Sequence, residues 1–392
     1  MSPLMATRSA DVLIVGAGPA GLYAAERLAR AGAHVLVCEE HATIGDPVHC
    51  TGILAADSFQ ALDLPDSATL NTLTVARFVS PSGVTVSYGT DAPLATVIDR
   101  PQFDRALASR ARAAGTVIET GARVVTFETG RNGVTAIAGD QQIRARLGIL
   151  ACGAHYSVQR RFGLGLPTAY LQTAQRELAA RQTPGVELHF GRGVAPDGFA
   201  WAVPVVRPDG LYVRVGVMAS ADVLGGYARM LARVADRWGI VDDGVPPRQK
   251  ILPLGSIDRT YADRLLVIGD AAGLVKPTTG GGIHYSMVSA ALAADVAVDA
   301  LARDRFDAAT LAAYETAWRR ALVDEFASQR ALRHVVTRLS DAELDDLFEL
   351  ARTDGIIPIV RATARFNQHR GLIRALFRHP PVRRILFGAA IG

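Results

Sequence analysis

Three glycines near the start of the chain have the spacing of a turn that holds a phosphate group. Gly16, Gly18 and Gly21 form a GxGxxG pattern, with Pro19 and Ala20 between them. In such a turn the first glycine permits a tight bend, the second lets the phosphate approach the backbone, and the third lets a helix pack closely on a strand. The free N–H groups at the start of that helix attract a pyrophosphate. The pattern therefore predicts a dinucleotide site.

Two carboxylates follow the turn at the distance expected of a ribose contact. Glu39 comes about 20 residues after the last glycine of the turn, where a carboxylate accepts hydrogen bonds from the adenosine ribose. A second carboxylate, Glu40, stands beside it. Its charge disfavours a 2′-phosphate at this place, so the sequence predicts that the nucleotide is not NADP.

Short apolar segments flank the turn in the order that a βαβ unit requires. Residues 11–15 form an apolar run of strand length, residues 22–31 are rich in alanine, and residues 34–38 have the pattern of a second strand. The order strand, glycine turn, helix, strand and acid places a phosphate at a helix N-terminus. These flanks make a dinucleotide-binding unit a far better explanation of the glycines than a chance turn.

A second glycine-rich motif lies far along the chain. A short apolar run ends in Gly269 and Asp270, and Gly281, Gly282 and Ile283 open a helical pattern. The Asp270 carboxylate can accept a hydrogen bond from a ribityl hydroxyl. The N–H groups at the start of the helix can face the flavin edge, where negative charge collects on reduction. A nicotinamide dehydrogenase has no use for this late return to the cofactor, so the two motifs together indicate FAD.

With these motifs the sequence resembles the geranylgeranyl reductase family, within the flavoproteins that fold like para-hydroxybenzoate hydroxylase. Two more segments carry the likeness. Residues 99–104 match a DRxxFD pattern, and the resemblance places its arginine, Arg100, near the flavin. Residues 153–160 are a looser version of a DGxxSxVR pattern, in which Gly153 is predicted to contact the cofactor.

Residues 46–52 narrow the family further, because they resemble the cysteine-glycine segment of prenyl reductases. The resemblance implies that Cys50, Thr51 and Gly52 lie at the flavin. The Cys50 thiol can tune the flavin or protonate a carbon, or it can simply fill space beside the ring. The neighbouring His49 is the other catalytic candidate, with a plain loop residue as its alternative.

Residues 199–204 resemble the YxWxFP segment of the same family, with Phe in place of Tyr and Val in place of Phe. The resemblance implies that Phe199, Trp201 and Pro204 line an apolar pocket for a lipid chain. Tyr212, one predicted strand further on, is a weaker candidate of the same kind. Ordinary packing within a sheet is the alternative for each of them.

The two lysines of the chain, Lys250 and Lys276, bear on a rival function. Tryptophan halogenases carry a related tryptophan-proline segment and need an active-site lysine. Since Lys276 lies inside the second glycine-rich motif, halogenation is disfavoured. Lys276 itself is expected either to contact the flavin or to face solvent.

The resemblance implies an α/β fold with three parts. These are a Rossmann-like FAD-binding domain of the para-hydroxybenzoate hydroxylase or glutathione reductase type, an inserted, mainly antiparallel β-sheet domain for the substrate, and a C-terminal helical region. The 392 residues suffice for more than one domain. In the helical region, Pro358 and Pro380-Pro381 are expected to break helices. The FAD-binding domain is expected to take 1–54, 95–165 and 258–300, the substrate domain 55–94 and 166–257, and the helical region 301–392.

The family likeness also implies an activity. It points to a reductase that saturates carbon–carbon double bonds of a geranylgeranyl-type isoprenoid chain, on a lipid, quinone or diphosphate, by hydride transfer from reduced FAD. The sequence has no second GxGxxG, so electrons are expected from transiently bound NAD(P)H or from ferredoxin. The alternatives are a monooxygenase of the same fold and a flavoprotein that passes electrons to quinones. The cysteine-glycine and tryptophan-proline segments argue against the first, and the lack of iron–sulfur cysteines argues against the second.

The positive charge of the chain gathers in its tail. The net charge is +4, yet Asp354 is the last acidic residue and seven arginines follow it. The body is therefore net negative, which argues against nucleic-acid binding. In the tail, Leu372, Ile373, Leu376 and Phe377 share one helical face with arginines beside it. This pattern fits either an anchor on anionic lipid or a helix docked on the protein itself.

The cysteines indicate the compartment. Cys38, Cys50 and Cys152 include no CxxC pair, which fits a reducing cytoplasm and predicts neither a disulfide framework nor a metal site. Cys38 and Cys152 are expected in the core. No apolar run reaches the ~18–20 residues of a membrane-spanning helix, and the N-terminal apolar run leads into a glycine turn instead of a cleavage site. We expect a cytoplasmic protein that is peripheral on the inner face of the cell membrane if its tail binds lipid.

Overall fold

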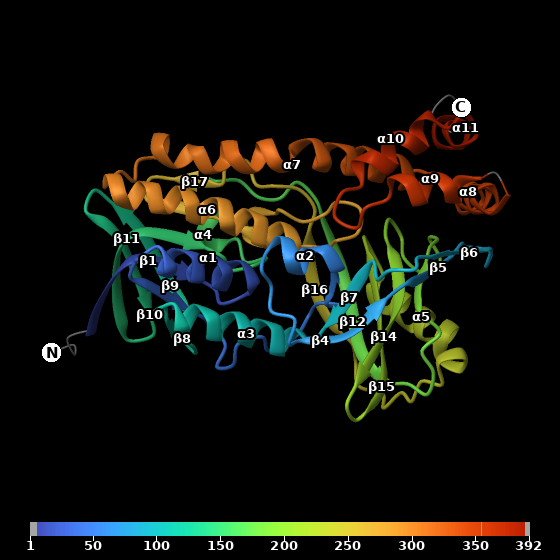
Figure 1. Cartoon of the computed structure of the whole chain (residues 1–392), viewed down its shortest axis with the longest axis horizontal. Helices are drawn as coiled ribbons and strands as arrows, with labels where there is room; N and C mark the ends of the chain where they lie inside the picture. Colours follow the sequence, from blue (N-terminus) through green and yellow to red (C-terminus); the bar gives the residue numbers. More distant parts are fainter. Residues whose placement is uncertain (1–5, 354, 389–392) are drawn as a thin grey trace.

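The structure is a computed structural model that describes residues 6–353 and 355–388 (Figure 1). A mixed β-sheet with helices packed on it forms one half of the molecule, and a second, largely antiparallel sheet forms the other. The C-terminal helices lie along one side of both halves. The predicted fold class is confirmed. The domain boundaries given above stay a prediction.

The first sheet is built around the glycine turn. Its central strand pairs in parallel with a neighbour on each side, and its residues Val12, Leu13 and Ile14 are fully buried. A parallel strand with both faces covered requires such a continuous apolar run. In spatial order the main strands are β17 (Tyr261–Ala262), β18 (Leu265–Val267), β11 (Gln141–Leu150), β1 (Ala6–Val15), β2 (Val35–Cys38) and β8 (Val117–Glu119), with β9 (Val124–Gly130) and β10 (Gly133–Ala138) attached to β11.

Helices α1 (Pro19–Arg30), α3 (Arg100–Ala113) and α6 (Ile283–Arg303) cover this sheet. Helix α1 begins earlier than the alanine pattern predicts, because Pro19 at its first position suits a helix start. Helix α3 begins after Asp99, whose carboxylate accepts a hydrogen bond from the Gln102 N–H at 2.9 Å.

Helix α6 is the one helix among the described residues that is long and apolar enough to cross a membrane on length and composition. The sequence analysis did not identify this helix, because it required an uninterrupted apolar run. Half of its most apolar window is buried inside the protein, and its alanines belong to the core shared with α1 and the first sheet. This packing is that of a core helix.

The second sheet lies beside the first (Figure 1). Helix α5 (Val223–Trp238) packs on its outer face, and a small sheet of β3 (Ile53–Ala55), β7 (Ala95–Ile98) and β4 (Thr69–Leu73) adjoins it, with the short helix α2 (Ala56–Ala61) following β3. In spatial order its strands are β16 (Arg248–Pro253), β12 (Tyr170–Ala179), β15 (Gly210–Ala219), β14 (Phe199–Arg207), β13 (Val186–His189), β5 (Val75–Val79) and β6 (Thr85–Gly89).

The C-terminal region is helical, as expected. One of its two predicted breaks is wrong, because Pro358 lies in the first turn of a helix, where a missing N–H costs nothing. The other is confirmed, since one helix ends at Arg378 and the next begins at Pro380. The helices are α7 (Ala308–Val336), α8 (Asp341–Thr353), α9 (Ile356–Thr363), α10 (Arg370–Arg378) and α11 (Pro380–Gly388).

Candidate flavin and substrate site

A cavity of about 1170 Å³ extends from the glycine turn, past the second sheet, to the C-terminal helices. Residues from both glycine-rich motifs, from the cysteine-glycine segment and from the tryptophan-proline segment line its wall. The sequence motifs, which lie far apart in the chain, therefore share one internal space.

The first glycine turn has the geometry that a pyrophosphate requires. Gly16 has φ +107°, and a Cβ there would lie 2.5 Å from the Ala151 carbonyl oxygen. A Cβ on Gly21 would lie 2.0 Å from the Gly16 oxygen. A Cβ on Gly18, in contrast, would meet no protein atom within 4 Å, because it would project into the cavity at the start of α1. The turn is thus closed toward the protein and open toward a ligand.

Glu39 lies at the wall of the cavity, and its carboxylate is already oriented by the backbone. One oxygen accepts a hydrogen bond from the Ala17 N–H at 2.8 Å, and the other accepts one from the His41 N–H at 3.0 Å. Glu40 also lines the cavity and lies 3.6 Å from the Arg123 guanidinium. Both carboxylates stand where a ribose next to the pyrophosphate would meet them.

The second glycine-rich motif faces the same cavity. Asp270, Gly281, Gly282 and Ile283 line its wall, and a Cβ on Gly282 would lie 2.7 Å from the Asp270 carboxylate. The Ser286 hydroxyl donates to that carboxylate at 3.3 Å. The start of α6 therefore presents N–H groups and a carboxylate together. Four other predicted cofactor residues also line the cavity, namely Pro19, Ala20, Arg100 and Gly153.

Two of the predicted cofactor residues, Gly21 and Gly269, do not line the cavity. Gly21 lies against the turn itself, and Gly269 has φ +61° with a Cβ position 2.9 Å from the Ser286 hydroxyl and 3.1 Å from the Ala20 Cβ. Both glycines permit close packing behind the cavity wall. Their effect on a cofactor is therefore indirect.

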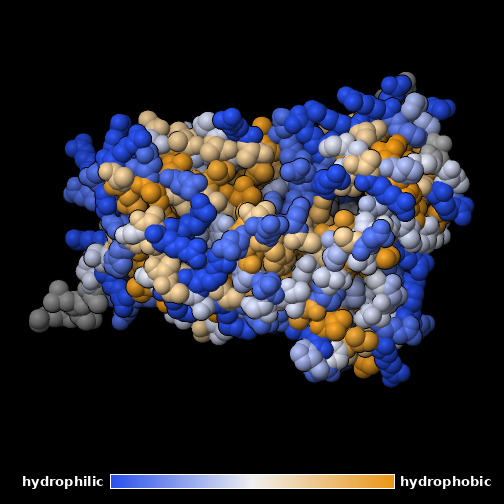
Figure 2. Space-filling view, in the orientation of Figure 1, coloured by the Kyte–Doolittle hydropathy of each residue, from blue (hydrophilic) through white to orange (hydrophobic). Residues whose placement is uncertain are grey.

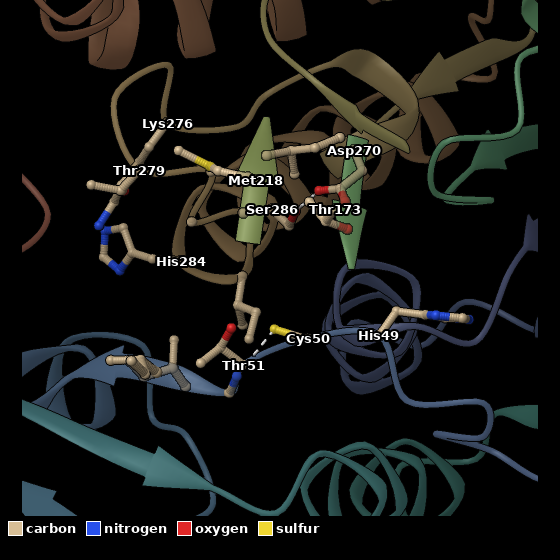
Figure 3. A pocket seen from close by; sticks show the side chains of 18 of the residues that line it. His49, Cys50, Thr51, Thr173, Met218, Asp270, Lys276, Thr279, His284 and Ser286 are labelled. Atoms are coloured by element: carbon tan, nitrogen blue, oxygen red, sulfur yellow. Dashed lines mark hydrogen bonds between the residues drawn. The ribbon is translucent and has the colours of Figure 1, made fainter. Parts of the chain in front are cut away.

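The cysteine-glycine segment forms the floor of the middle of the cavity. Figure 3 shows the Cys50 sulfur turned toward the centre of the pocket and the His49 ring turned away from it. The sulfur accepts a hydrogen bond from the Gly52 N–H at 3.3 Å, and the Thr51 hydroxyl donates to the Gln175 amide oxygen at 2.6 Å. The structure thus brings Cys50 into the cavity and separates it from His49, its predicted catalytic neighbour.

Arg100 lies next to the Cys50 thiol. Its guanidinium is largely buried and forms an ion pair with Asp104 at 2.8 Å. Burial lowers the pKa of Arg100, but Asp104 and Cys50 together raise it by more, so the guanidinium stays charged. A fixed positive charge therefore faces the sulfur.

His49 lines the cavity as a neutral group. Burial, followed by the nearby charges of Lys250 and Arg248, lowers its pKa to about 4. Its Nδ1 is buried and has no hydrogen-bond partner within the part of the chain that the structure describes. At neutral pH His49 cannot act as a cationic acid, so a catalytic role for it stays a prediction that this geometry does not favour.

Three residues that the motif analysis missed hold the cysteine-glycine segment in place. The buried Arg214 donates to the Thr51 carbonyl at 2.6 Å and to the Glu177 carboxylate at 2.9 Å. The amide oxygen of Gln175 accepts from both Thr51 and the Trp201 indole, the latter at 3.2 Å. The sequence does contain one signal that could have identified Arg214. It is the one charged residue inside an otherwise apolar strand pattern.

The tryptophan-proline segment contributes two of its three predicted pocket residues. Phe199 and Trp201 line the cavity, whereas Pro204 and Tyr212 do not, so the prediction for these two is wrong. Successive residues of a strand point to opposite faces, and Pro204 pairs with Val213 on the face that α5 covers. Tyr212 shares the face of Trp201, but it lies toward the hairpin end, where its hydroxyl donates to Asp209.

The other cysteines follow the expectation in part. Cys38 is buried in β2, as predicted. Cys152 is half-buried and lines the cavity, with its thiol donating to the His155 carbonyl, so it is not a core residue. It lies two residues beyond the carboxyl end of β11, the edge of an open α/β sheet at which ligands bind.

Lys276 does not face solvent, contrary to one of the two expectations for it. It is 3 % exposed and donates to the Phe366 carbonyl at 2.7 Å and to the Asn367 side-chain oxygen at 2.8 Å. The Asn367 amide donates in turn to the Ser58 hydroxyl at 2.8 Å. Lys276 therefore ties the second glycine-rich motif to the segment between α9 and α10. Burial lowers its pKa to about 7.

The Lys276→Met variant should lose part of the pH dependence of stability. The folded protein releases the Lys276 proton near pH 7, whereas the unfolded chain keeps it until the ordinary pKa of 10.5. Between these values the unfolded state binds one more proton, so the free energy of unfolding of the wild type rises with pH by about 1.4 kcal/mol per unit relative to the variant. Urea unfolding of both proteins from pH 7 to 9 measures this difference. Parallel curves would mean that Lys276 is charged in the folded protein throughout.

Comparison with known proteins places the chain in a family. The family model described as lycopene cyclase protein matches residues 11–370. Digeranylgeranylglycerophospholipid reductase of Methanocaldococcus jannaschii is 30% identical over 352 aligned positions, and the alignment covers 86% of this chain and 90% of the relative. The reductase of the same name from Methanothrix thermoacetophila is 30% identical over 396 aligned positions, and the alignment covers 95% of this chain and 96% of the relative.

Solved structures agree in fold. A geranylgeranyl bacteriochlorophyll reductase-like protein from Thermoplasma acidophilum aligns with a TM-score of 0.83 at 23% identity, covering 98% of this chain and all of the other. The halogenase PltM aligns with a TM-score of 0.69 at 17% identity, covering 97% and 86%. These likenesses concern the fold alone, while the motifs and the curated relatives decide the family. The chain belongs to the geranylgeranyl reductase family of FAD-dependent oxidoreductases.

Proposed function

We propose that this chain binds FAD and, with the flavin reduced, saturates carbon–carbon double bonds in the isoprenoid chains of a phospholipid. The curated relatives are named as reductases of digeranylgeranylglycerophospholipid. One observation carries the proposal: a single cavity joins the dinucleotide motifs to a wall of apolar and aromatic residues. A flavin and a long apolar chain can meet there without water between them.

The residues present fit FAD. The open position at Gly18 leaves room for the pyrophosphate, and Glu39 is poised for the ribose. Asp270 and the N–H groups at the start of α6 would meet the ribityl chain and the flavin edge. Arg100 and the cysteine-glycine segment would border the ring. These are the places where a flavin requires donors, a carboxylate and space.

Reduced FAD would supply the hydride that adds to one alkene carbon. An unactivated alkene offers no group to polarise, so the protein's share is to position the chain and to exclude water. Trp201 and Phe199 give the cavity an apolar side. The Cys50 thiol points into the cavity beside Arg100, and we propose that it delivers a proton to the second carbon.

The electron donor is part of the proposal. The sequence has one GxGxxG unit, so we expect NAD(P)H or a ferredoxin to reduce the flavin in a transient encounter. Anaerobic mixing of the oxidised protein with each donor, followed by absorbance at the flavin band, distinguishes the two. The donor that bleaches the flavin within the turnover time is the physiological class.

The proposed reaction is tested on the purified flavoprotein under nitrogen. The flavin is reduced with dithionite, the excess is removed, and digeranylgeranylglycerophospholipid in detergent is added. We expect flavin reoxidation together with a lipid mass increase of two hydrogens for each double bond. Failure of the lipid to reoxidise the flavin, or a hydroxylated product when oxygen is admitted, would favour a monooxygenase of the same fold.

The C-terminal tail is docked on the protein, which bears on its expected contact with lipid. Ile373 is buried, Leu372 and Leu376 line the cavity, and Phe377 packs against Phe387 at a centroid distance of 5.4 Å. These apolar side chains are therefore not free to insert into a bilayer. The tail arginines point outward, and Figure 2 shows hydrophilic side chains along this edge of the molecule. We propose that these charges alone hold the protein on the cytoplasmic face of the membrane.

Replacing Arg374, Arg378, Arg383 and Arg384 with glutamine should weaken binding to anionic vesicles. Each exposed arginine near such a surface contributes about 1 kcal/mol, so the loss should reach at least tenfold at low salt and vanish at high salt. Cosedimentation with vesicles rich in anionic phospholipid measures it. Activity on detergent-dispersed substrate should survive.

A matched control removes four exposed arginines from the opposite end of the molecule (Figure 1). This variant has the same net charge and should bind vesicles like the wild type. If both variants lost vesicle binding equally, the effect would come from the net charge of the protein and not from the tail arginines. The control positions are Arg131, Arg144, Arg303 and Arg305.

A further inference from the structure

A row of aromatic rings leads from the cysteine-glycine segment toward the C-terminal helices. The Trp201 indole donates to the same Gln175 oxygen that holds Thr51. The ring centroids of Trp201 and Phe199 are 5.8 Å apart, those of Phe199 and Phe190 are 5.9 Å apart, and the next step, to Phe348 on α8, is 5.7 Å. All four rings line the cavity. The row therefore marks a continuous apolar path away from the proposed flavin position.

Helix α8 turns part of its apolar face toward the cavity. Leu347, Phe348 and Ala351 share one side of the helix and line the cavity. None of the residues of α8 is buried, although the helix carries four leucine and phenylalanine side chains. An apolar helix face that stays half-exposed inside the protein borders an internal space that an apolar ligand can fill.

The neighbouring helices close the far end of this space. Ile356 and Val360 of α9, Leu376 of α10 and Leu386 of α11 line the cavity, and they belong to the same apolar cluster. Figure 1 shows α8 and α9 beside the β5–β6 end of the second sheet, remote from the glycine turn. The cavity therefore has an apolar arm, which we define as the part lined by α8, α9, α10 and α11.

Polar contacts hold the wall of this arm in position. The Asp345 carboxylate on α8 accepts from the Ser82 N–H at 3.0 Å and from the Ser82 hydroxyl at 2.8 Å, and the Ser80 hydroxyl donates to it as well. At the start of the helix, the Asp341 carboxylate accepts from the Arg192 N–H at 2.9 Å. These bonds join α8 to the second sheet, so the depth of the arm is set by a fixed wall.

We infer that the apolar arm takes the far end of the isoprenoid chain, and that Ala351 sets how long a chain the protein accepts. This inference rests on the proposed function and adds a chain-length determinant to it. Ala351 has a small side chain and lines the cavity three residues beyond Phe348, where the aromatic row ends. A chain lying along that row with one double bond near Cys50 would extend its terminal units past Phe348 into the arm.

The test measures binding, so that it does not depend on reduction. Saturated isoprenoid alcohols of ten, fifteen and twenty carbons are titrated into the FAD-loaded protein in detergent by calorimetry. A buried methylene strengthens binding by roughly fourfold, so each added isoprene unit should tighten the wild-type complex by at least about tenfold. In Ala351→Trp the gain from fifteen to twenty carbons should disappear, while the ten-carbon alcohol should bind like wild type.

The matched control is Ala342→Trp, which adds the same ring to an exposed position of α8 that does not line the cavity. It should keep the wild-type dependence on chain length. Wild-type affinities that do not change with length, or an Ala351→Trp protein that follows the control, would overturn the inference. If the affinity for the alcohols rises with chain length but the protein reduces no prenyl lipid, the proposed function is refuted. The inference about the apolar arm is then retained.

Discussion

A protein carrying Gly18→Val should fold normally and be purified without flavin. Gly18 is the residue before α1 and has φ −77°, a value that valine adopts without strain. The new side chain would meet no protein atom near its Cβ, so it projects into the cavity where the backbone must approach a pyrophosphate. The Gly18→Val variant should therefore keep the wild-type fold, while its valine side chain excludes the pyrophosphate of FAD.

The expected loss is large because a phosphate depends on backbone hydrogen bonds at this turn. A hydrogen bond to a charged group contributes about 1.5–3 kcal/mol, so losing two of them weakens binding by roughly a hundredfold to ten-thousandfold. The absorbance ratio of flavin to protein after gel filtration measures stoichiometry, and titration of the apoprotein with FAD measures affinity.

Gly193→Val is the matched control. Gly193 also has open space around its Cβ position and no positive φ, but it lies outside the cavity wall. This variant should retain full flavin. If Gly18→Val also retains stoichiometric FAD with the wild-type melting temperature, the pyrophosphate does not lie at this turn.

The second large effect is expected from Cys50→Ala, which should keep FAD and lose reduction of the alkene. Cys50 lies away from the phosphate end of the cavity, and its sulfur points toward the centre of the pocket (Figure 3). A positioned proton donor typically contributes 10²–10⁴-fold to a rate. We therefore expect reoxidation of the reduced flavin by the prenyl lipid to slow by about a hundredfold.

Two further variants sharpen this result. Cys50→Ser keeps the size of the side chain but is a far weaker acid, so it should be nearly as slow as the alanine variant. Cys38→Ala removes a thiol buried in β2 and should leave the rate unchanged. Wild-type rates and products in Cys50→Ala would show that the thiol only fills space beside the ring.

The sequence by itself determined the fold class, the βαβ unit and the second glycine-rich motif. The requirements behind these patterns are steric. At Gly16 a side chain would collide with the Ala151 backbone, and at Gly21 it would collide with the turn itself. The Gly21 contact lies within the turn, whereas Ala151 is far along the chain from Gly16. Both demands nevertheless fall on glycines of one short turn, so they leave a spacing that can be read without coordinates.

The surroundings of Cys50 were decided by tertiary structure. Arg214 and Gln175 hold its segment from strands that lie more than a hundred residues further along the chain. The outcome for Pro204 depended on which face of the strand it occupies, since one step along a strand reverses the face of a side chain. The outcome for Tyr212 depended on its place near the hairpin end of the sheet. No motif encodes which face the helix α5 will cover.

The same reason explains Lys276 and the tail. From sequence alone, a lysine in a glycine-rich loop is expected to be exposed. Lys276 is buried because the segment between α9 and α10 covers it. The amphipathic pattern of 370–378 suits a membrane surface and a protein surface equally, because both offer an apolar face. Packing against α7, α9 and α11 settled that choice.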